Sequence, residues 1–204
     1  MQTESVESGF LSIFALLTFF IFLITNKYSY KLNNGVLLDK DFSKPQAFHK
    51  NVVARSGGIA SIISLILFFY IYHLIFSEIL YEYIFICSSL FFIGYLDDTK
   101  VKINPIIRLI LMTCFLIVFI IFLPIEIYNI DLIFLNSWLK NNIFSTLFIL
   151  ICFLFIVNGA NLIDGFNGLL AINLIIINSI LLSINMNNNN FEFSVFLISQ
   201  IIIL

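Results

Sequence analysis

Seven long apolar runs are the feature that most restricts how this chain can fold. They cover residues 9–25, 56–76, 79–95, 105–123, 143–157, 168–185 and 191–204. Hydrophobic residues make up 61% of the chain and charged residues 11%, and apolar runs of this length cross a bilayer as helices. The sequence therefore predicts an all-α, polytopic bundle of about seven transmembrane helices, forming one domain over residues 1–204.

The charged residues exclude one class of function and one kind of leader. The net charge is -2, and the ten Lys and Arg residues do not gather into a basic domain, so no nucleic-acid binding is expected. The first apolar run is preceded by Glu4 and Glu7 with no Lys or Arg, which is atypical of a signal peptide. We interpret it as a retained membrane span.

The basic residues also predict which side of the membrane each connection occupies. Connections rich in Lys and Arg stay in the cytoplasm. Nine of the ten fall on the side of connections 26–55, 96–104 and 158–167: Lys27, Lys31, Lys40, Lys44, Lys50, Arg55, Lys100, Lys102 and Arg108. Only Lys140 falls on the other side, in a 124–142 connection where Trp138 is typical of an interfacial anchor. The N-terminus is therefore expected outside and the three connections inside.

Three polar clusters stand where apolar runs reach the predicted cytoplasmic surface. They are Arg55-Ser56-Gly57-Gly58, Gly94-Tyr95-Leu96-Asp97-Asp98, and the segment from Asn158 to Gly165. Carboxylates and amides are costly beside a bilayer. Their convergence from different helices predicts an assembled polar site for phosphate and metal.

Asp97 and Asp98 end the third apolar run, where the helix dipole presents its negative end. Two carboxylates there need a positive partner. One interpretation is a solvated pair held by Lys100 and Lys102. The other is that at least one carboxylate faces Mg²⁺ or a proton to be removed.

Asn158, Asn161 and Asp164 recur every three residues, so they share one face if the fifth run continues through them as a helix. Asn and Gly at a helix end are also ordinary capping residues, and that alternative stays open. Mg²⁺ prefers oxygen ligands, including carboxylates. Asp97, Asp98 and Asp164 would supply a partial cage for Mg²⁺, with Mn²⁺ as an alternative.

The 26–55 connection supplies positive charge. Lys44, His49, Lys50 and Arg55 are suited to neutralising phosphates, and Gly57-Gly58 would allow close backbone approach. Simple anchoring of the protein by its basic residues is the alternative.

The segments HKNVVARSGGIA, GYLDDTKVKINPIIRL and NGANLIDGFNGL, in this order, resemble the polyprenyl-phosphate N-acetylhexosamine-1-phosphate transferase family, also called glycosyl transferase family 4. The resemblance implies a bacterial inner-membrane enzyme with its active site on the cytoplasmic face. It implies Mg²⁺-dependent transfer of a sugar 1-phosphate from a UDP-sugar to undecaprenyl phosphate. UMP would be released, and synthesis of a cell-wall or lipopolysaccharide-type glycan would begin.

The resemblance also implies roles for individual residues. Asp97 and Asp98 match the catalytic aspartate pair, of which we favour Asp97 as the base, and Asp164 matches the metal ligand. The expected substrate-binding residues are Lys44, His49, Lys50, Arg55, Asn158, Asn161 and Asn167. Membrane lipid is a further expected partner, and a homodimer is left open.

The sequence departs from the family pattern at three places. Many relatives have proline where Ala54 stands and aspartate where Asn167 stands. A later His-containing cytoplasmic loop would lie beyond Leu204, and residues 191–204 are short for a span. We therefore expect a C-terminally shortened member that inserts but does not catalyse transfer alone.

Two functions of other classes compete with this interpretation. An ion-coupled transporter would place polar residues near midspan, whereas these lie at the ends of the runs. A CDP-alcohol phosphotransferase would carry a denser array of aspartates. An inactive, shortened family member is a further alternative.

The topology can be tested by cysteine labelling. With the three native cysteines replaced, Lys44→Cys, Lys100→Cys and Asn161→Cys should each resist a membrane-impermeant thiol reagent in intact cells, because all three positions are predicted to face the cytoplasm. Labelling should appear once the cells are opened. Labelling of any of the three from outside would contradict the common side of the polar clusters.

Overall fold

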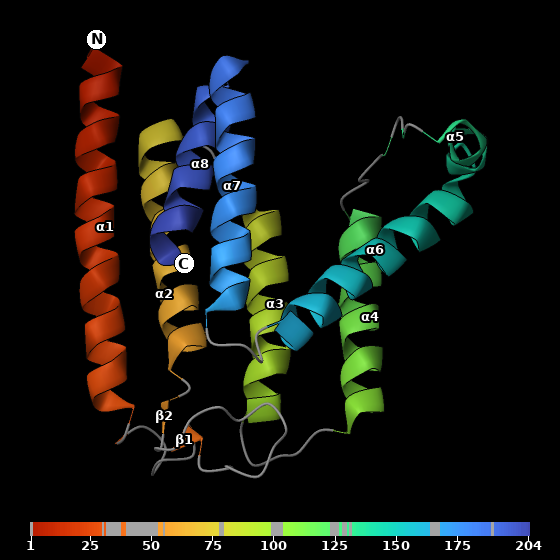
Figure 1. The fold of residues 1–204 in the computed structure, drawn as a ribbon, viewed down its shortest axis with the longest axis horizontal. Helices are drawn as coiled ribbons and strands as arrows, with labels where there is room; N and C mark the ends of the chain where they lie inside the picture. Colours follow the sequence, from red (N-terminus) through yellow and green to blue (C-terminus); the bar gives the residue numbers. More distant parts are fainter. Residues whose placement is uncertain are drawn as a thin grey trace. The chain divides into compact units, whose positions relative to one another are not determined.

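The computed structural model describes residues 2–29, 31, 38–39, 53–54, 56–77, 80–98, 104–122, 127, 130, 132–163, 168–188 and 190–204. Its helices are α1 (Gln2–Tyr28), α2 (Gly57–Phe76), α3 (Tyr81–Asp98), α4 (Pro105–Phe122), α5 (Ile133–Leu139), α6 (Asn142–Ile163), α7 (Leu169–Asn187) and α8 (Phe191–Ile203), shown in Figure 1. Two short strands, β1 (Leu38–Asp39) and β2 (Val53–Ala54), pair antiparallel. The predicted all-α class is confirmed, with this small ladder as an addition.

Each of the seven predicted apolar runs coincides with a helix. Five helices are long and apolar enough to cross a membrane: α1 over Gly9–Tyr28, α2, α4, α6 over Asn142–Ala160, and α7. The other two, α3 and α8, contain shorter apolar stretches. The prediction of about seven spans is thus consistent with the structure. Helix α5 was not predicted, because seven residues make only about two turns.

Local polar groups define where several helices begin and end. Asn104 precedes Pro105, the first residue of α4, and its Oδ1 accepts the Ile106 N–H at 3.2 Å. Proline is suited to the first helical position because its missing N–H would have no intrahelical partner there. At the end of α2, Ser77 has a left-handed backbone, and its N–H donates to the His73 carbonyl. These bonds satisfy terminal groups that the helices leave open.

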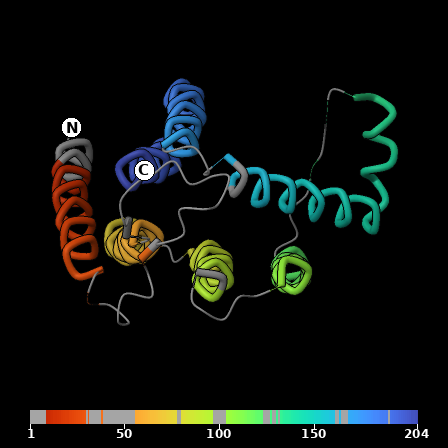
Figure 2. Tube along the Cα trace, turned by 60° about the horizontal axis from the view of Figure 1, so that its bottom comes forward, coloured from red at the N-terminus to blue at the C-terminus, as the bar shows by residue number. Residues whose placement is uncertain are grey.

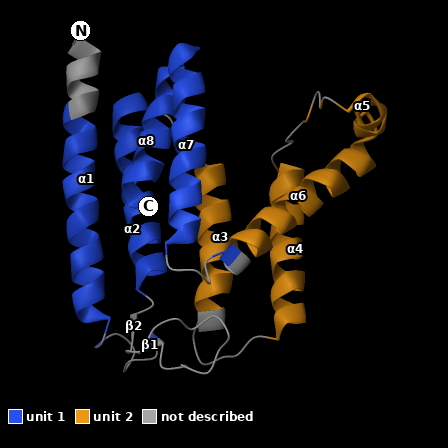
Figure 3. Cartoon of the chain, in the orientation of Figure 1, with its two compact units in different colours: residues 1–80, 163–204 blue, residues 81–162 orange. Residues whose placement is uncertain are grey.

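The chain forms two compact units, shown in Figure 3. Unit 1 contains Met1–Leu80 and Ile163–Leu204, and unit 2 contains Tyr81–Leu162. Each is described by itself below. The single domain expected over residues 1–204 stays a prediction.

Unit 1 is held together by aromatic side chains and small residues where α1, α2 and α8 pack. Phe68 of α2 is fully buried, and its ring centroid lies 5.6 Å from that of Phe14 in α1 and 5.9 Å from that of Phe196 in α8. Ala60 and Ser64, also fully buried, lie two turns and one turn before Phe68 on the same face. Small residues let helix backbones approach closely in a membrane, so this face explains the three-helix contact.

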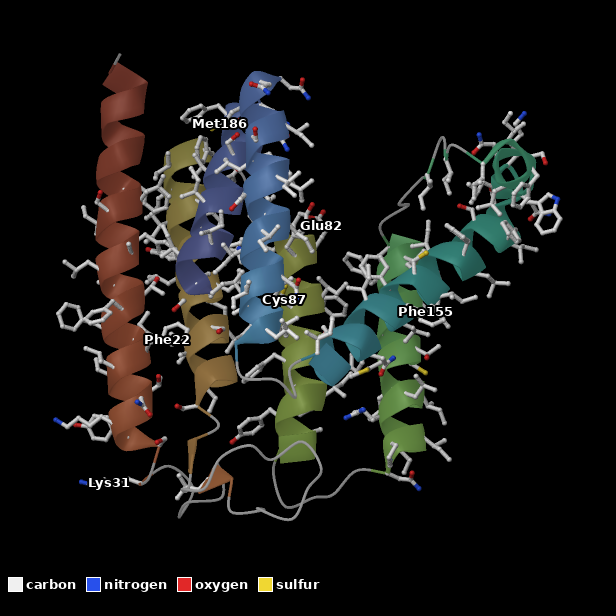
Figure 4. The ribbon with its side chains drawn as sticks, in the orientation of Figure 1. Phe22, Lys31, Glu82, Cys87, Phe155 and Met186 are labelled. Carbon is white, nitrogen blue, oxygen red and sulfur yellow. The ribbon has the colours of Figure 1, made fainter. Side chains whose placement is uncertain are left out.

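The ends of unit 1 follow the predicted alternation of spans. Figure 1 shows that α2 and α7 both begin toward the end of the unit at which α1 finishes. Figure 4 labels Lys31 at that end, beside β1, and Met186 at the opposite end of α7. The end of α1, the start of α2 and the start of α7 are therefore on one side of this unit.

Unit 2 is built around α4 and α6. Leu116, Phe119 and Ile120 of α4 form a buried cluster with Ile149 and Leu150 of α6. Ile86 of α3 packs against the same cluster. The Phe119 and Phe153 rings meet nearly edge to face, with centroids 6.3 Å apart. This geometry is favourable for aromatic pairs.

We expect Phe68→Ala to destabilise the protein by about 3 kcal/mol, because it removes a fully buried ring that contacts two neighbouring helices. Unfolding of the purified protein in detergent, followed by circular dichroism, measures this. Phe19→Ala is the matched control, since that ring is 61% exposed and should cost less than about 1 kcal/mol. Equal losses in the two variants would contradict the assigned core.

Candidate functional site

The carboxylate pair occupies the C-terminal end of α3. Asp97 and Asp98 are the last two residues of this helix, as the sequence predicted, and no basic residue stands in its last turn. The carbonyl end of the helix and two carboxylates thus concentrate negative charge at one place. Such an end favours a cation or a proton, although the two side chains themselves lie outside the described part of the chain.

The amide motif lies in α6, which continues to Ile163. The helical continuation expected for the fifth run is therefore confirmed as far as that residue, which places Asn158 and Asn161 about one turn apart on the same face. Asn158 donates from Nδ2 to the Leu154 carbonyl at 2.8 Å. This bond orients the amide and leaves its Oδ1 as the remaining acceptor. The side chain of Asn161 is outside the described part.

The next helix begins after a left-handed turn. Gly168 has φ +77° and directly precedes α7, as expected for an opening glycine. A residue with a Cβ would be strained at this φ. The predicted metal ligand Asp164 and the predicted substrate-binding residue Asn167 lie in the 164–167 segment, outside the described residues.

The first turn of α2 begins with an uncapped serine and a glycine. Ser56 is buried and forms no side-chain cap bond, and no described residue lies within 4 Å of the place that a Cβ on Gly57 would take. The N–H groups of a first helical turn attract anions. The β1–β2 ladder pairs Leu38 with Ala54 just before this turn. In sequence, Lys44, His49 and Lys50 fall between the two strands and Arg55 follows β2, and all four lie outside the described residues.

Within unit 2, the two parts of the predicted site stand at different levels. Figure 1 shows the C-terminal end of α6 level with the middle of α3, whereas Asp98 ends α3. The structure therefore does not bring the Asn158 turn to the carboxylate pair within this unit. Convergence of all three polar clusters stays a prediction.

The candidate metal ligands can be judged by their chemistry. Among the described residues, no group of three or more His, Cys, Asp or Glu side chains is arranged to hold a metal ion. The Asp97, Asp98 and Asp164 side chains lie outside that part. All three offer carboxylate oxygens, which are the donors that Mg²⁺ takes, so the donor set fits this ion.

An apolar groove along α3 is a feature that the sequence interpretation missed. It has a volume of about 590 Å³ and is lined by Tyr81, Ile84, Phe85, Ser88, Ser89, Phe92 and Phe115. All but Phe115, which belongs to α4, lie on α3 at helical spacing. From Tyr81 to Phe92 the helix rises roughly 16 Å. The groove is shallow and largely open, and it lies on the same helix that carries the carboxylate pair.

A comparison with known protein families gives a match over most of the helices described above. The sequence pattern described as glycosyl transferase family 4 matches residues 80–204. This range includes the Asp97-Asp98 pair and the 158–165 motif but not the first polar cluster. No curated protein and no solved structure matches the chain. The family match covers more than half of the 204 residues, and the chain belongs to glycosyl transferase family 4.

Proposed function

We propose that this multi-pass membrane protein transfers a sugar 1-phosphate, of the N-acetylhexosamine type, from a UDP-sugar to undecaprenyl phosphate with release of UMP. The observation that carries the proposal is the family match. It includes the carboxylate pair that ends α3 and the 158–165 motif, which begins in α6. Membership of a transferase family also favours this function over an ion-coupled transporter.

The carboxylates divide the chemical work. Asp97 removes the proton from the acceptor phosphate, whose oxygen then forms a bond to the sugar-linked phosphorus of the donor. The bond from that phosphorus to the UMP oxygen breaks, and UMP leaves. Mg²⁺ held by Asp98 and Asp164 would supply positive charge to the phosphate oxygens. Phosphoryl transfer depends mainly on such positioning and charge stabilisation.

The basic connection before α2 handles the phosphates. Lys44, His49, Lys50 and Arg55 offset their negative charge, and the open first turn of α2 offers backbone N–H groups to the same anions. Arg55 adjoins Ser56 and the start of α2 in sequence, so its guanidinium has the shortest reach to that turn.

The apolar groove on α3 supports a lipid acceptor. Its aromatic and aliphatic lining suits an isoprenoid chain, and its helix ends one and a half turns beyond Phe92 at the carboxylate pair. A phosphate bound at that end would leave its chain in contact with the groove. The proposed location is the bacterial inner membrane, with the phosphates on the cytoplasmic side, where the resulting lipid-linked sugar begins an envelope glycan.

The function is tested by incubating membranes from cells that express the protein with radiolabelled UDP-sugars and undecaprenyl phosphate. Formation of lipid-linked label and stoichiometric UMP is expected. Asp97→Asn, Asp98→Asn and Asp164→Asn keep the side-chain shape but remove the charge. Each should lower UMP release by about 10²-fold or more, as for loss of a base or an electrostatic stabiliser.

Glu82→Gln is the control for these carboxylate variants, because Glu82 lies at the opposite end of α3. It should keep its activity. Near-normal turnover in all three Asp variants, with normal insertion, would refute the assigned chemistry. Absence of transfer from every UDP-sugar would refute the proposed function itself.

A matched pair of variants, at Asn158 and Asn185, separates a role of Asn158 in substrate binding from its role in the helix. Asn185, near the C-terminal end of α7, makes the same kind of bond as Asn158, from Nδ2 to the Leu181 carbonyl at 2.8 Å, but on the side of the membrane that the sequence predicts to be outside. Asn158→Leu should raise KM for the UDP-sugar or the acceptor roughly tenfold, as for loss of a hydrogen bond to a charged group. Asn185→Leu should leave KM unchanged. Equal effects would show that the in-helix bond alone matters.

A further inference from the structure

The seven-residue helix α5 carries a surface that neither the proposed reaction nor the packing of unit 2 uses. Ile133 is 88% exposed, Phe134 61% and Trp138 58%, whereas Leu139 on another face is buried. Phe134 and Trp138 are four residues apart, so they are neighbours on the helix surface. Three large apolar side chains exposed on so short a helix need an apolar partner.

The direction of α5 differs from that of the spans beside it. Figure 1 views α5 along its own axis, while α4 and α6 appear lengthwise. Figure 2, turned by 60°, shows α4 nearly end-on, whereas α5 and the strongly tilted α6 both appear lengthwise and point in different directions. If α4 crosses a bilayer, α5 lies along the plane of that bilayer.

The corner between α5 and α6 is built by specific contacts. Asn141 accepts the Ile143 N–H on Oδ1 at 3.0 Å, and its own N–H donates to the Trp138 carbonyl at 3.0 Å. The Trp138 ring meets the Phe144 ring nearly edge to face, with centroids 5.4 Å apart. Before the start of α5, the Ile130 N–H donates to Oδ1 of Asn136, which lies in the middle of the helix, at 2.8 Å. These bonds hold α5 at a set angle to the start of α6.

The exposed face of α5 continues the apolar surfaces of two candidate spans. Ile121 and Phe122 at the end of α4, and Ile143 at the start of α6, are strongly exposed. Both helices qualify as membrane spans. In the chain, α5 lies between the end of α4 and the start of α6, so if both of these helices span a bilayer, α5 belongs to a connection at its surface.

We propose that α5 is an interfacial membrane helix whose Phe134 and Trp138 side chains insert at the boundary between headgroups and acyl chains. Amphipathic helices of this kind lie in the interface with their apolar face buried about 5–10 Å, and Trp is enriched at this depth. Lys140, exposed at the C-cap of α5, would be able to reach the headgroups. The helix thereby sets the depth of α6, which carries the Asn158 motif at its other end.

The depth of Trp138 can be measured directly, since it is the only tryptophan in the chain. The protein is reconstituted in phosphatidylcholine vesicles that contain lipids brominated either near the headgroup or near the chain end. We expect the shallow bromines to quench Trp138 fluorescence at least about twofold more than the deep ones, consistent with interfacial depth. Aqueous iodide should quench it weakly.

A double variant, Trp138→Phe with Phe155→Trp, provides the deep reference, because Phe155 is 75% exposed near the middle of α6 and is labelled in Figure 4. Its fluorescence should be quenched most by the deep bromines. Three results for Trp138 would overturn the proposal: strongest quenching by the deep bromines, ready quenching by iodide, or no quenching by either lipid, which would show that protein covers α5.

Discussion

Backbone N–H and C=O groups that lie in hydrocarbon must find partners within their own segment, because lipid tails offer none. This requirement explains why the apolar runs of this chain are helices, and why glycines, amides and carboxylates collect where helices begin or end. Gly57 starts α2, Asp97 and Asp98 end α3, and Gly168 precedes α7. These candidate site residues therefore stand at helix termini, where unpaired backbone groups add their own charge.

Between helices, the fit of side chains matters more than hydrophobicity, since a lipid tail is as apolar as leucine. Unit 1 achieves this fit with the small residues Ala60 and Ser64 beside the large ring of Phe68. Unit 2 uses branched and aromatic residues of α4 and α6 around Phe119. The two solutions leave many large side chains of α7 exposed, with no buried residue in that helix, as suits a surface that faces lipid or another helix.

The proposed chemistry uses opposite helix polarities. The C-terminal end of α3 gathers negative charge for proton removal and Mg²⁺, while the N-terminal turn of α2 offers N–H groups to phosphate. In the same proposal, the groove on α3 would contact the apolar chain of the acceptor. In the proposal for α5, this short helix sets the membrane depth of α6, the helix that carries Asn158 near its C-terminal end.

The sequence alone determined the helical class, the number of apolar spans and their limits to within a few residues for most of them, because burial in lipid makes long apolar runs unmistakable. It also identified the family through three motifs, at residues 49–60, 94–109 and 158–169, of which the last two lie in the range that the family match covers. It missed α5, whose two turns carry no clear period, and the α3 groove, which requires Phe115 of α4 beside α3. Angles between helices and shared cavities depend on contacts between distant residues, so only the tertiary structure decided them.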